Sequence, residues 1–395
     1  MYLTNSFQRE LSAILSYWST YTLDEEYGGF YGKIDSDNCV VPHAPKGSVL
    51  NARILWTFSA AYNATQRPDY LLLATRAFEY FTQYFIDSEY GGVYWTVDYK
   101  GQPLDTKKQI YALAFALYGL SEYYIASRDL QALEQAQELF RAIEQYSYDA
   151  ENGGYLEALT RDWTTLNDLR LSAKDANEKK TTNTHLHVLE AYANLYRACP
   201  EALLKQRLVE LLLLFNDHII DAGTHHLHLF FSEQWVARPD VISFGHDIEA
   251  AWLLLEAAEL AGDEILLTRF QQLAVALARA AAEGLATNGG LNYEYEPAQQ
   301  HMVAEKHWWV QAEAMIGFFN AFELTREAQF YDYFLAVWEF TQRYLIDHKH
   351  GEWHWGVAAD NSLMMREDKA GLWKCPYHNS RACLQILKRL ENTLV

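Results

Sequence analysis

The 395-residue chain contains few cysteines, no long apolar run and fewer basic than acidic residues. Its four cysteines (Cys39, Cys199, Cys375 and Cys383) show no CxxC spacing, which argues against a disulfide scaffold or a zinc motif. No apolar stretch reaches membrane-spanning length, and residues 1–20 lack the apolar centre of a signal peptide. We therefore expect a cytoplasmic protein with reduced thiols.

The shortage of basic residues also limits the partners. With 32 Lys and Arg against 52 Asp and Glu, the formal net charge is -20. Such a field repels nucleic acid, anionic membranes and polyanionic substrates, so we expect a neutral small molecule as the ligand. Aromatic residues make up 15% of the chain, and their flat rings suit either a large core or the C–H faces of a sugar. Because no Pro/Ser-rich linker is present, we expect a single domain over residues 1–395, acting as a monomer.

A weak repeat runs through the whole chain. Acidic or polar residues precede a glycine and then an aromatic run at 24–31, 87–94, 150–155, 221–223, 287–291 and 350–353. The first glycines of these segments are 63, 62, 70, 66 and 62 residues apart. Six units of similar size indicate a repeat architecture.

Each unit predicts a short hairpin followed by two helices. The expected helix pairs lie at 46–64 and 68–86, 107–127 and 130–147, 182–198 and 200–218, 245–261 and 264–284, and 306–324 and 327–346. A last helix at 376–391 must pair with the first at 4–20. Twelve helices with a unit shared between the two ends of the chain predict an all-α, closed (α/α)6 barrel with short β-hairpins in its loops. An open helical solenoid is the alternative, but it needs capping repeats at its ends.

The first helix of each pair is the more apolar, as expected for an inner ring, yet each begins with polar or aromatic residues. They are Arg53, Tyr111, Asn183 with His187, His246 with Glu249, Trp308 and Trp309 with Glu313, and His378 after Trp373. If the inner helices run parallel, these first turns converge at one end of the barrel axis. Core packing does not require such convergence, so it predicts an active site.

Three histidines at this point indicate acid–base chemistry, because imidazole titrates nearest to neutral pH. The positive end of the helix dipole disfavours the imidazolium, which keeps a base neutral. Arg53 can stabilise a developing oxyanion. Glu249 lies three residues after His246, and we expect it to orient that imidazole.

Three other uses of these residues remain open. His225, His226 and His228, with His185 and His187, resemble metal ligands, although the first three alternate with leucines in an expected strand, where neighbours point to opposite faces. Asp247, Glu249 and Glu313 could flank a glycosidic bond in a hydrolase, which would leave the histidines unexplained. A binding protein on the same scaffold would not need titratable groups.

Six segments of the sequence resemble the N-acylglucosamine 2-epimerase superfamily, in particular its disaccharide 2-epimerases. They are residues 48–56, 90–95, 183–187, 244–250, 308–314 and 373–379, in order along nearly the whole chain. The resemblance implies an (α/α)6 barrel that inverts C2 of the reducing-end glucose of cellobiose-type β-1,4-disaccharides, without a metal or other cofactor. Relatives that interconvert free mannose and glucose provide an alternative substrate.

The resemblance also implies roles for single residues. His246 and His378 would act as acid and base on opposite faces of C2, and His187 would assist ring opening. Arg53, Tyr111, Asn183 and Glu249 would bind or polarise the opened sugar, while Trp309 and Trp373 stack on it and Asp175 reaches its hydroxyls. Trp308 and Glu313 complete the expected substrate-binding set. The loop at 160–180 is expected to shape the site beyond the reducing sugar.

Overall fold

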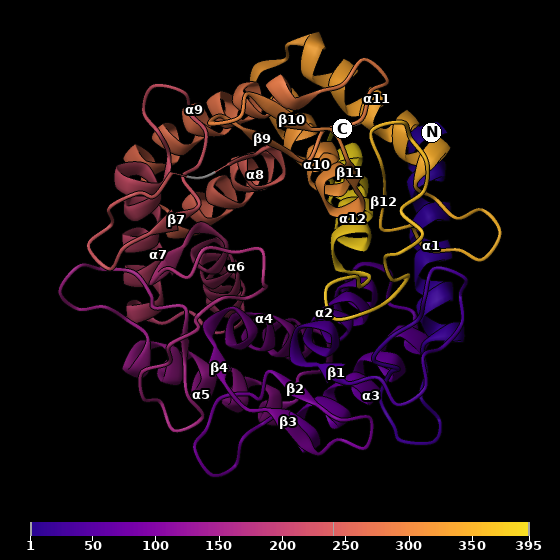
Figure 1. Cartoon of the computed structure of the whole chain (residues 1–395), viewed down its shortest axis with the longest axis vertical. Coiled ribbons are helices and arrows are strands. Elements are labelled where there is room, and N and C mark those ends of the chain that lie inside the picture. Colours follow the sequence, from indigo (N-terminus) through magenta and orange to yellow (C-terminus); the bar gives the residue numbers. More distant parts are fainter. Residues whose placement is uncertain (1, 240, 394–395) are drawn as a thin grey trace.

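Twelve α-helices form two concentric rings in the computed structural model, which describes residues 2–239 and 241–393 (Figure 1). The inner ring consists of α2 (Ser48–Thr65), α4 (Ile110–Ser127), α6 (Thr182–Ala198), α8 (Phe244–Ala261), α10 (Trp308–Thr325) and α12 (Tyr377–Thr393). The outer ring consists of α1 (Tyr2–Tyr21), α3 (Pro68–Tyr84), α5 (Leu130–Tyr146), α7 (Ala202–Leu214), α9 (Glu264–Ala281) and α11 (Ala328–Tyr344). The (α/α)6 barrel expected from the repeat is confirmed. No helix in the described part of the chain is long and apolar enough to cross a membrane.

The division into rings follows from the hydrophobic pattern. In α4 every residue from Ile110 to Ser121 is buried, because other helices cover the inner helix on most sides. In α5 only a stripe is buried, made of Ala132, Ala136, Leu139, Phe140 and Ile143, which is the spacing of one helix face. The outer helices therefore bury one side against the inner ring and leave the other in water.

Short strands connect each unit to the next at the end of the barrel where the inner helices begin. The strands are β1 (Lys46–Gly47), β2 (Thr96–Val97), β3 (Pro103–Asp105), β4 (Lys108–Gln109), β5 (Ala158–Leu159), β6 (Lys180–Thr181), β7 (Phe230–Phe231), β8 (Ile242–Ser243), β9 (Glu294–Glu296), β10 (His301–Val303), β11 (Lys306–His307) and β12 (Gly356–Val357). The strand before an inner helix pairs antiparallel with a strand that follows the next outer helix, as β1 pairs with β2 and β4 with β5. This pairing fixes where each inner helix starts.

Buried lysines anchor the same helix starts. Lys46 Nζ lies 2.7 Å from Asp24, and Lys108 Nζ lies 2.8 Å from Asp87, with both lysines almost inaccessible to solvent. Lys180 forms the same contact with Asp149. In the fifth unit Ala286 replaces the aspartate, and Lys306 Nζ donates to the carbonyl of Ala304 instead.

The two ends of the chain close the ring. Helix α1 packs beside α12, the first and last helices in Figure 1. Trp18 Nε1 donates to Glu352 at 2.5 Å, and Trp353 Nε1 donates to Glu10 at 2.7 Å. These buried hydrogen bonds join the N-terminal helix to the last glycine turn, so the fold is the closed barrel and not the open solenoid.

Candidate active site

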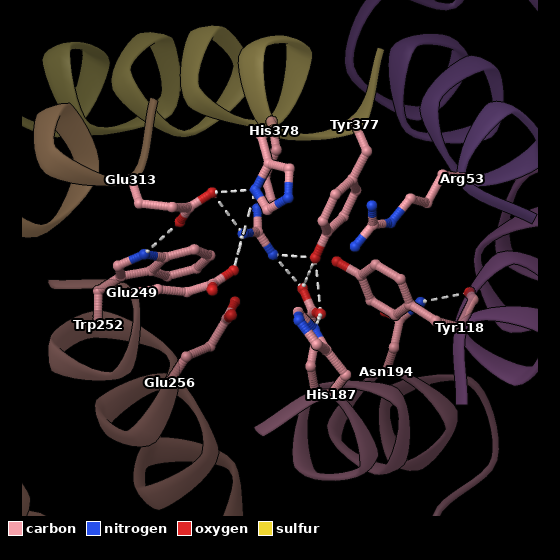
Figure 2. A network of polar contacts seen from close by, with 12 residues as sticks. Arg53, Tyr118, His187, Asn194, Glu249, Trp252, Glu256, Glu313, Tyr377 and His378 are labelled. Atoms are coloured by element: carbon pink, nitrogen blue, oxygen red, sulfur yellow. Dashed lines mark hydrogen bonds and ion pairs between the residues drawn. The ribbon is translucent and has the colours of Figure 1, made fainter. Parts of the chain in front are cut away.

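The inner helices bring one residue from each unit to the barrel axis in the same register. The sixth residues of the first five inner helices are Arg53, Phe115, His187, Glu249 and Glu313. In the last helix the amide of Ser380 bonds the carbonyl of Pro376, and counting from Pro376 the sixth residue is Arg381. A ring of parallel helices with a common start therefore gathers two arginines, one histidine and two carboxylates around one axis. Figure 2 shows Arg53, His187, Glu249 and Glu313 among them.

The three predicted histidines are held in the same way. Nδ1 of His187 lies 3.0 Å from Glu190, Nδ1 of His378 lies 2.7 Å from Glu313, and Nδ1 of His246 lies 2.8 Å from the hydroxyl of Ser243. No described residue hydrogen-bonds to Nε2 of any of the three. Each imidazole is thus oriented through Nδ1 and leaves Nε2 for a ligand, which suits proton transfer.

Burial keeps two of these histidines neutral. It lowers the pKa of His246 to about 3, and the nearby His187 lowers it as well. Burial also lowers the pKa of His378 well below its ordinary value, and the positive charges of Arg53 and Arg381 act in the same direction. Both imidazoles are therefore uncharged at neutral pH and can accept a proton.

Arg53 is a buried cation whose described contacts include no carboxylate. Nη2 donates to the hydroxyl of Tyr111 at 2.7 Å, Nη1 lies 3.8 Å from the sulfur of Cys375, and the guanidinium carbon is 4.0 Å from the ring centre of Phe115. Its Nε has no hydrogen-bond partner among the described residues. A guanidinium held without a counter-ion is suited to an anion that forms during a reaction.

Aromatic side chains line the same end of the axis. Trp309 is half-buried, with its ring centre 5.0 Å from that of His246 and 5.8 Å from that of His378. Trp373 is also half-buried and lies 6.1 Å from Tyr111. Their partly exposed faces are suited to stacking on a sugar ring.

Three further predicted residues occupy different places. Trp308 is buried against Trp355, with a ring-centre distance of 4.6 Å, so it packs behind the site. Asn183 is half-buried in the first turn of α6. Asp175 is half-buried in the loop before α6, where its carboxylate accepts the amide of Ser172.

A buried arginine that the sequence analysis did not single out connects the predicted residues. Arg381 is 1% exposed and bonds Glu190, Glu249 and Glu313. Tyr377 donates its hydroxyl to both carboxylate oxygens of Glu190, at 2.5 and 2.6 Å. Figure 2 shows Glu249, Glu313, His378, Tyr377 and His187 pointing toward one another within this network. Arg381 and His187 lower the pKa of Glu190 to about 2 although burial opposes its ionisation.

The expected pairing of Glu249 with His246 is wrong. The carboxylate of Glu249 lies 2.7 Å from Arg381 and 4.0 Å from Nδ1 of His378, and Ser243 orients His246. Residues three apart on a helix do share a face, but the Glu249 carboxylate pairs with the guanidinium of Arg381, which comes from another helix. Glu190 and Arg381 each lie three residues after an assigned histidine, a spacing that could have revealed them.

The alternative uses of these residues find little support. His226 Nδ1 lies 2.7 Å from Asp247, and Nε2 of His185 accepts the amide of Tyr155, so each takes part in a loop contact. Among the described residues, Glu249, Glu313 and His378 form the group with metal-ligand spacing, but Arg381 Nη2 bonds both carboxylates at 2.7 Å. Because a guanidinium lies between them, Glu249 and Glu313 do not flank a space for a glycosidic bond.

Known proteins are similar to this chain over nearly its whole length. The N-acylglucosamine 2-epimerase (GlcNAc 2-epimerase) family matches residues 29–382. A cellobiose 2-epimerase of Bacteroides fragilis is 49% identical over 386 residues, which cover 98% of both chains. The structure of a cellobiose 2-epimerase from Bacillus thermoamylovorans superimposes with a TM-score of 0.93 at 39% identity, covering 98% of this chain and 99% of the other. A D-mannose isomerase of Marinomonas mediterranea is 23% identical over 97% of this chain and 96% of its own.

Proposed function

The chain belongs to the N-acylglucosamine 2-epimerase family, and from this premise we propose that it inverts C2 of the reducing-end glucose of cellobiose-type disaccharides, giving the mannose epimer. The observation that carries the proposal is the pair of neutral histidines, His246 and His378, beside a single indole, that of Trp309. Inversion at one carbon needs a proton removed from one face and returned to the other, and therefore two acid–base groups.

The reaction begins with ring opening. A cyclic sugar has no acidic C–H bond at C2, so the C1–O5 bond must break before C2 can react. Nε2 of His187 takes the proton of the O1 hydroxyl, and the electrons of that O–H bond form the C1=O1 double bond. The C1–O5 electrons remain on O5, which receives the proton from the His187 imidazolium, and an open aldehyde results. Glu190 supports this step because its carboxylate accepts a hydrogen bond from Nδ1–H of His187 and stabilises the positive charge that the imidazole gains.

Proton transfer at C2 follows. One histidine removes the C2 proton, and the electrons of the C–H bond form a C1–C2 double bond while the aldehyde oxygen becomes an enediolate oxygen. Arg53 stabilises this negative charge, and Tyr111, which accepts a hydrogen bond from Arg53, holds the guanidinium in place. The first histidine releases its proton to solvent, and the other histidine takes up a proton from solvent and delivers it to C2 from the opposite face, so that the aldehyde re-forms with C2 inverted. Trp309 and Trp373 stack on the sugar while C2 loses its proton on one face and gains a proton on the other.

The test incubates the protein with cellobiose, and separately with mannose, in D₂O. Deuterium at C2 of an epimerised product, followed by NMR, is the expected result. Glycosidic cleavage without C2 exchange would overturn the proposal in favour of a hydrolase. Comparison of the two sugars decides between a disaccharide and free mannose as the substrate. A chelator control tests our expectation that no metal takes part: activity lost and then restored by a divalent ion would contradict it.

A further inference from the structure

Arg381 links two of the three histidines through their carboxylate partners. It lies on α12 one turn after His378, and its guanidinium bonds Glu313 at 2.7 Å and also Glu190. Glu313 holds Nδ1 of His378, and Glu190 holds Nδ1 of His187. His246 lies outside this network, because its Nδ1 contacts the Ser243 hydroxyl. Of the two histidines proposed to act on C2, His378 is therefore held by a carboxylate and His246 by a hydroxyl.

The state of Glu313 decides which nitrogen of His378 carries the hydrogen. An ionised Glu313 can only accept, so Nδ1 must donate to it and Nε2 keeps its lone pair. A protonated Glu313 would donate its O–H to Nδ1, and Nε2 would then carry the hydrogen and could not act as a base. Burial raises the pKa of Glu313, and the negative charge of Glu190 acts in the same direction, whereas Arg381 and the indole N–H of Trp252, 3.0 Å away, oppose that rise. Glu249, which shares Arg381 Nη2 with Glu313, lies 4.0 Å from Nδ1 of His378. The guanidinium is therefore the main charge that favours the ionised form of Glu313.

We propose that Arg381 is a positioning residue that holds His378 ready as a base by keeping Glu313 ionised, while His246 works independently of it. This inference rests on the proposed function. Without Arg381, Glu313 stays protonated at neutral pH, and the His378–Glu313 pair then holds one more proton than in the wild type, on Nε2. A serine hydroxyl can donate or accept, so the state of His246 does not change with the charge at position 381.

The asymmetry has a measurable consequence in D₂O. A histidine that removes the C2 proton can exchange it with solvent and return deuterium to the same face, which labels the substrate without inverting it. One epimer is labelled in this way by His246 and the other by His378, since their C2 protons face opposite sides. Loss of Arg381 should therefore slow labelling of one recovered epimer more than the other, because any effect through Glu190 and His187 on ring opening is common to both epimers.

The experiment measures the initial rate of C2 deuteration in the recovered, uninverted substrate for each epimer of the disaccharide between pH 6 and pH 10. In Arg381→Met we expect at least a tenfold loss for one epimer at pH 7, regained as the pH rises, because one pKa unit corresponds to a factor of about ten. Arg381→Lys, which restores a positive charge, should recover labelling at pH 7. Ser243→Ala should slow labelling of the opposite epimer.

Matched controls separate this inference from its alternatives. Arg389→Met removes another ion-paired arginine of α12, bonded to Glu323, and should leave both rates unchanged. Thermal unfolding establishes that each variant is folded, and Arg381→Gln, which keeps a polar side chain without the charge, carries the test if Arg381→Met does not fold. An equal loss for both epimers in a folded variant, or no loss in either, would overturn the role of Arg381. A wild-type protein that neither labels nor epimerises the sugar would instead refute the proposed function.

Discussion

The imidazoles of His246 and His378 lie beside the same indole, with ring centres 5.0 and 5.8 Å from that of Trp309. They come from α8 and α12, which are separated by α10 in the inner ring, and α10 supplies the indole between them. A sugar stacked on Trp309 would therefore have one histidine at each side of its reacting carbon.

Replacement of either histidine by glutamine should nearly abolish epimerisation. A positioned acid or base contributes about 10²–10⁴-fold, and inversion needs both groups. Steady-state rates with cellobiose give the loss, and thermal unfolding shows that the fold is intact. If one of the two variants kept more than a tenth of the wild-type rate, the two-histidine mechanism would be wrong.

Trp309→Ala should weaken substrate binding, whereas Trp309→Phe should keep most of it. An aromatic contact contributes about 0.5–1.5 kcal/mol, so KM should rise roughly threefold to tenfold in the alanine variant. Because the indole lies beside both histidines, C2 labelling should fall equally for both epimers, in contrast to Arg381→Met. Unequal effects would show that Trp309 serves one histidine alone.

Arg53→Lys should lower kcat by about 10²-fold although the positive charge remains. Loss of one preformed donor to an oxyanion typically costs about 10²–10³ in kcat, and a lysine cannot reproduce the planar guanidinium geometry. The measurement is kcat and KM with cellobiose, and Tyr111→Phe, which removes the hydroxyl that Arg53 contacts, should give a smaller effect in the same direction. Wild-type turnover in Arg53→Lys would exclude the proposed role.

Glu157→Gln should stabilise the protein at high pH. Burial raises the pKa of Glu157 to about 8 in the folded chain from 4.5. A raised carboxyl pKa contributes stability that is complete below pH 4.5 and is lost as the pH rises through 8, because the folded state binds the proton more tightly. A glutamine does not titrate, so the variant keeps this part of the free energy of unfolding at high pH, which is on the order of a few kcal/mol. Urea unfolding at pH 5 and pH 9 measures it, with the exposed Glu151→Gln as the control that should show no such difference.

Lys306→Met should stabilise the fold or leave it unchanged, whereas Lys46→Met should destabilise it. Among the residues that the structure describes, no carboxylate pairs with Lys306, whose Nζ donates to a carbonyl 2.8 Å away. Lys46 instead neutralises the buried Asp24, and removal of one partner of a buried pair costs about 3–5 kcal/mol. Denaturant unfolding of both variants compares the two free energies. A large destabilisation by Lys306→Met would contradict this account of the fifth unit.

Much of the architecture could be predicted because it depends on local patterns. The helix expected at 182–198 is found at Thr182–Ala198, and that expected at 130–147 at Leu130–Tyr146. The positions of His187, His246 and His378 in the first two turns of inner helices also follow from the repeat. The partners of these residues could not be predicted in the same way, as the wrong pairing of Glu249 with His246 shows.

The sequence by itself determined which residues face the barrel axis, because the repeat sets where each inner helix starts and 3.6 residues per turn set which side chains point inward. Only the tertiary structure decided which of those side chains meet. Glu190 and Arg381 are 191 residues apart in sequence, yet they form an ion pair because the closed ring directs α6 and α12 toward one axis. Electrostatic attraction grows as charges are buried and brought close, so the protonation state of each titratable group at the axis depends on contacts that form only in the folded ring.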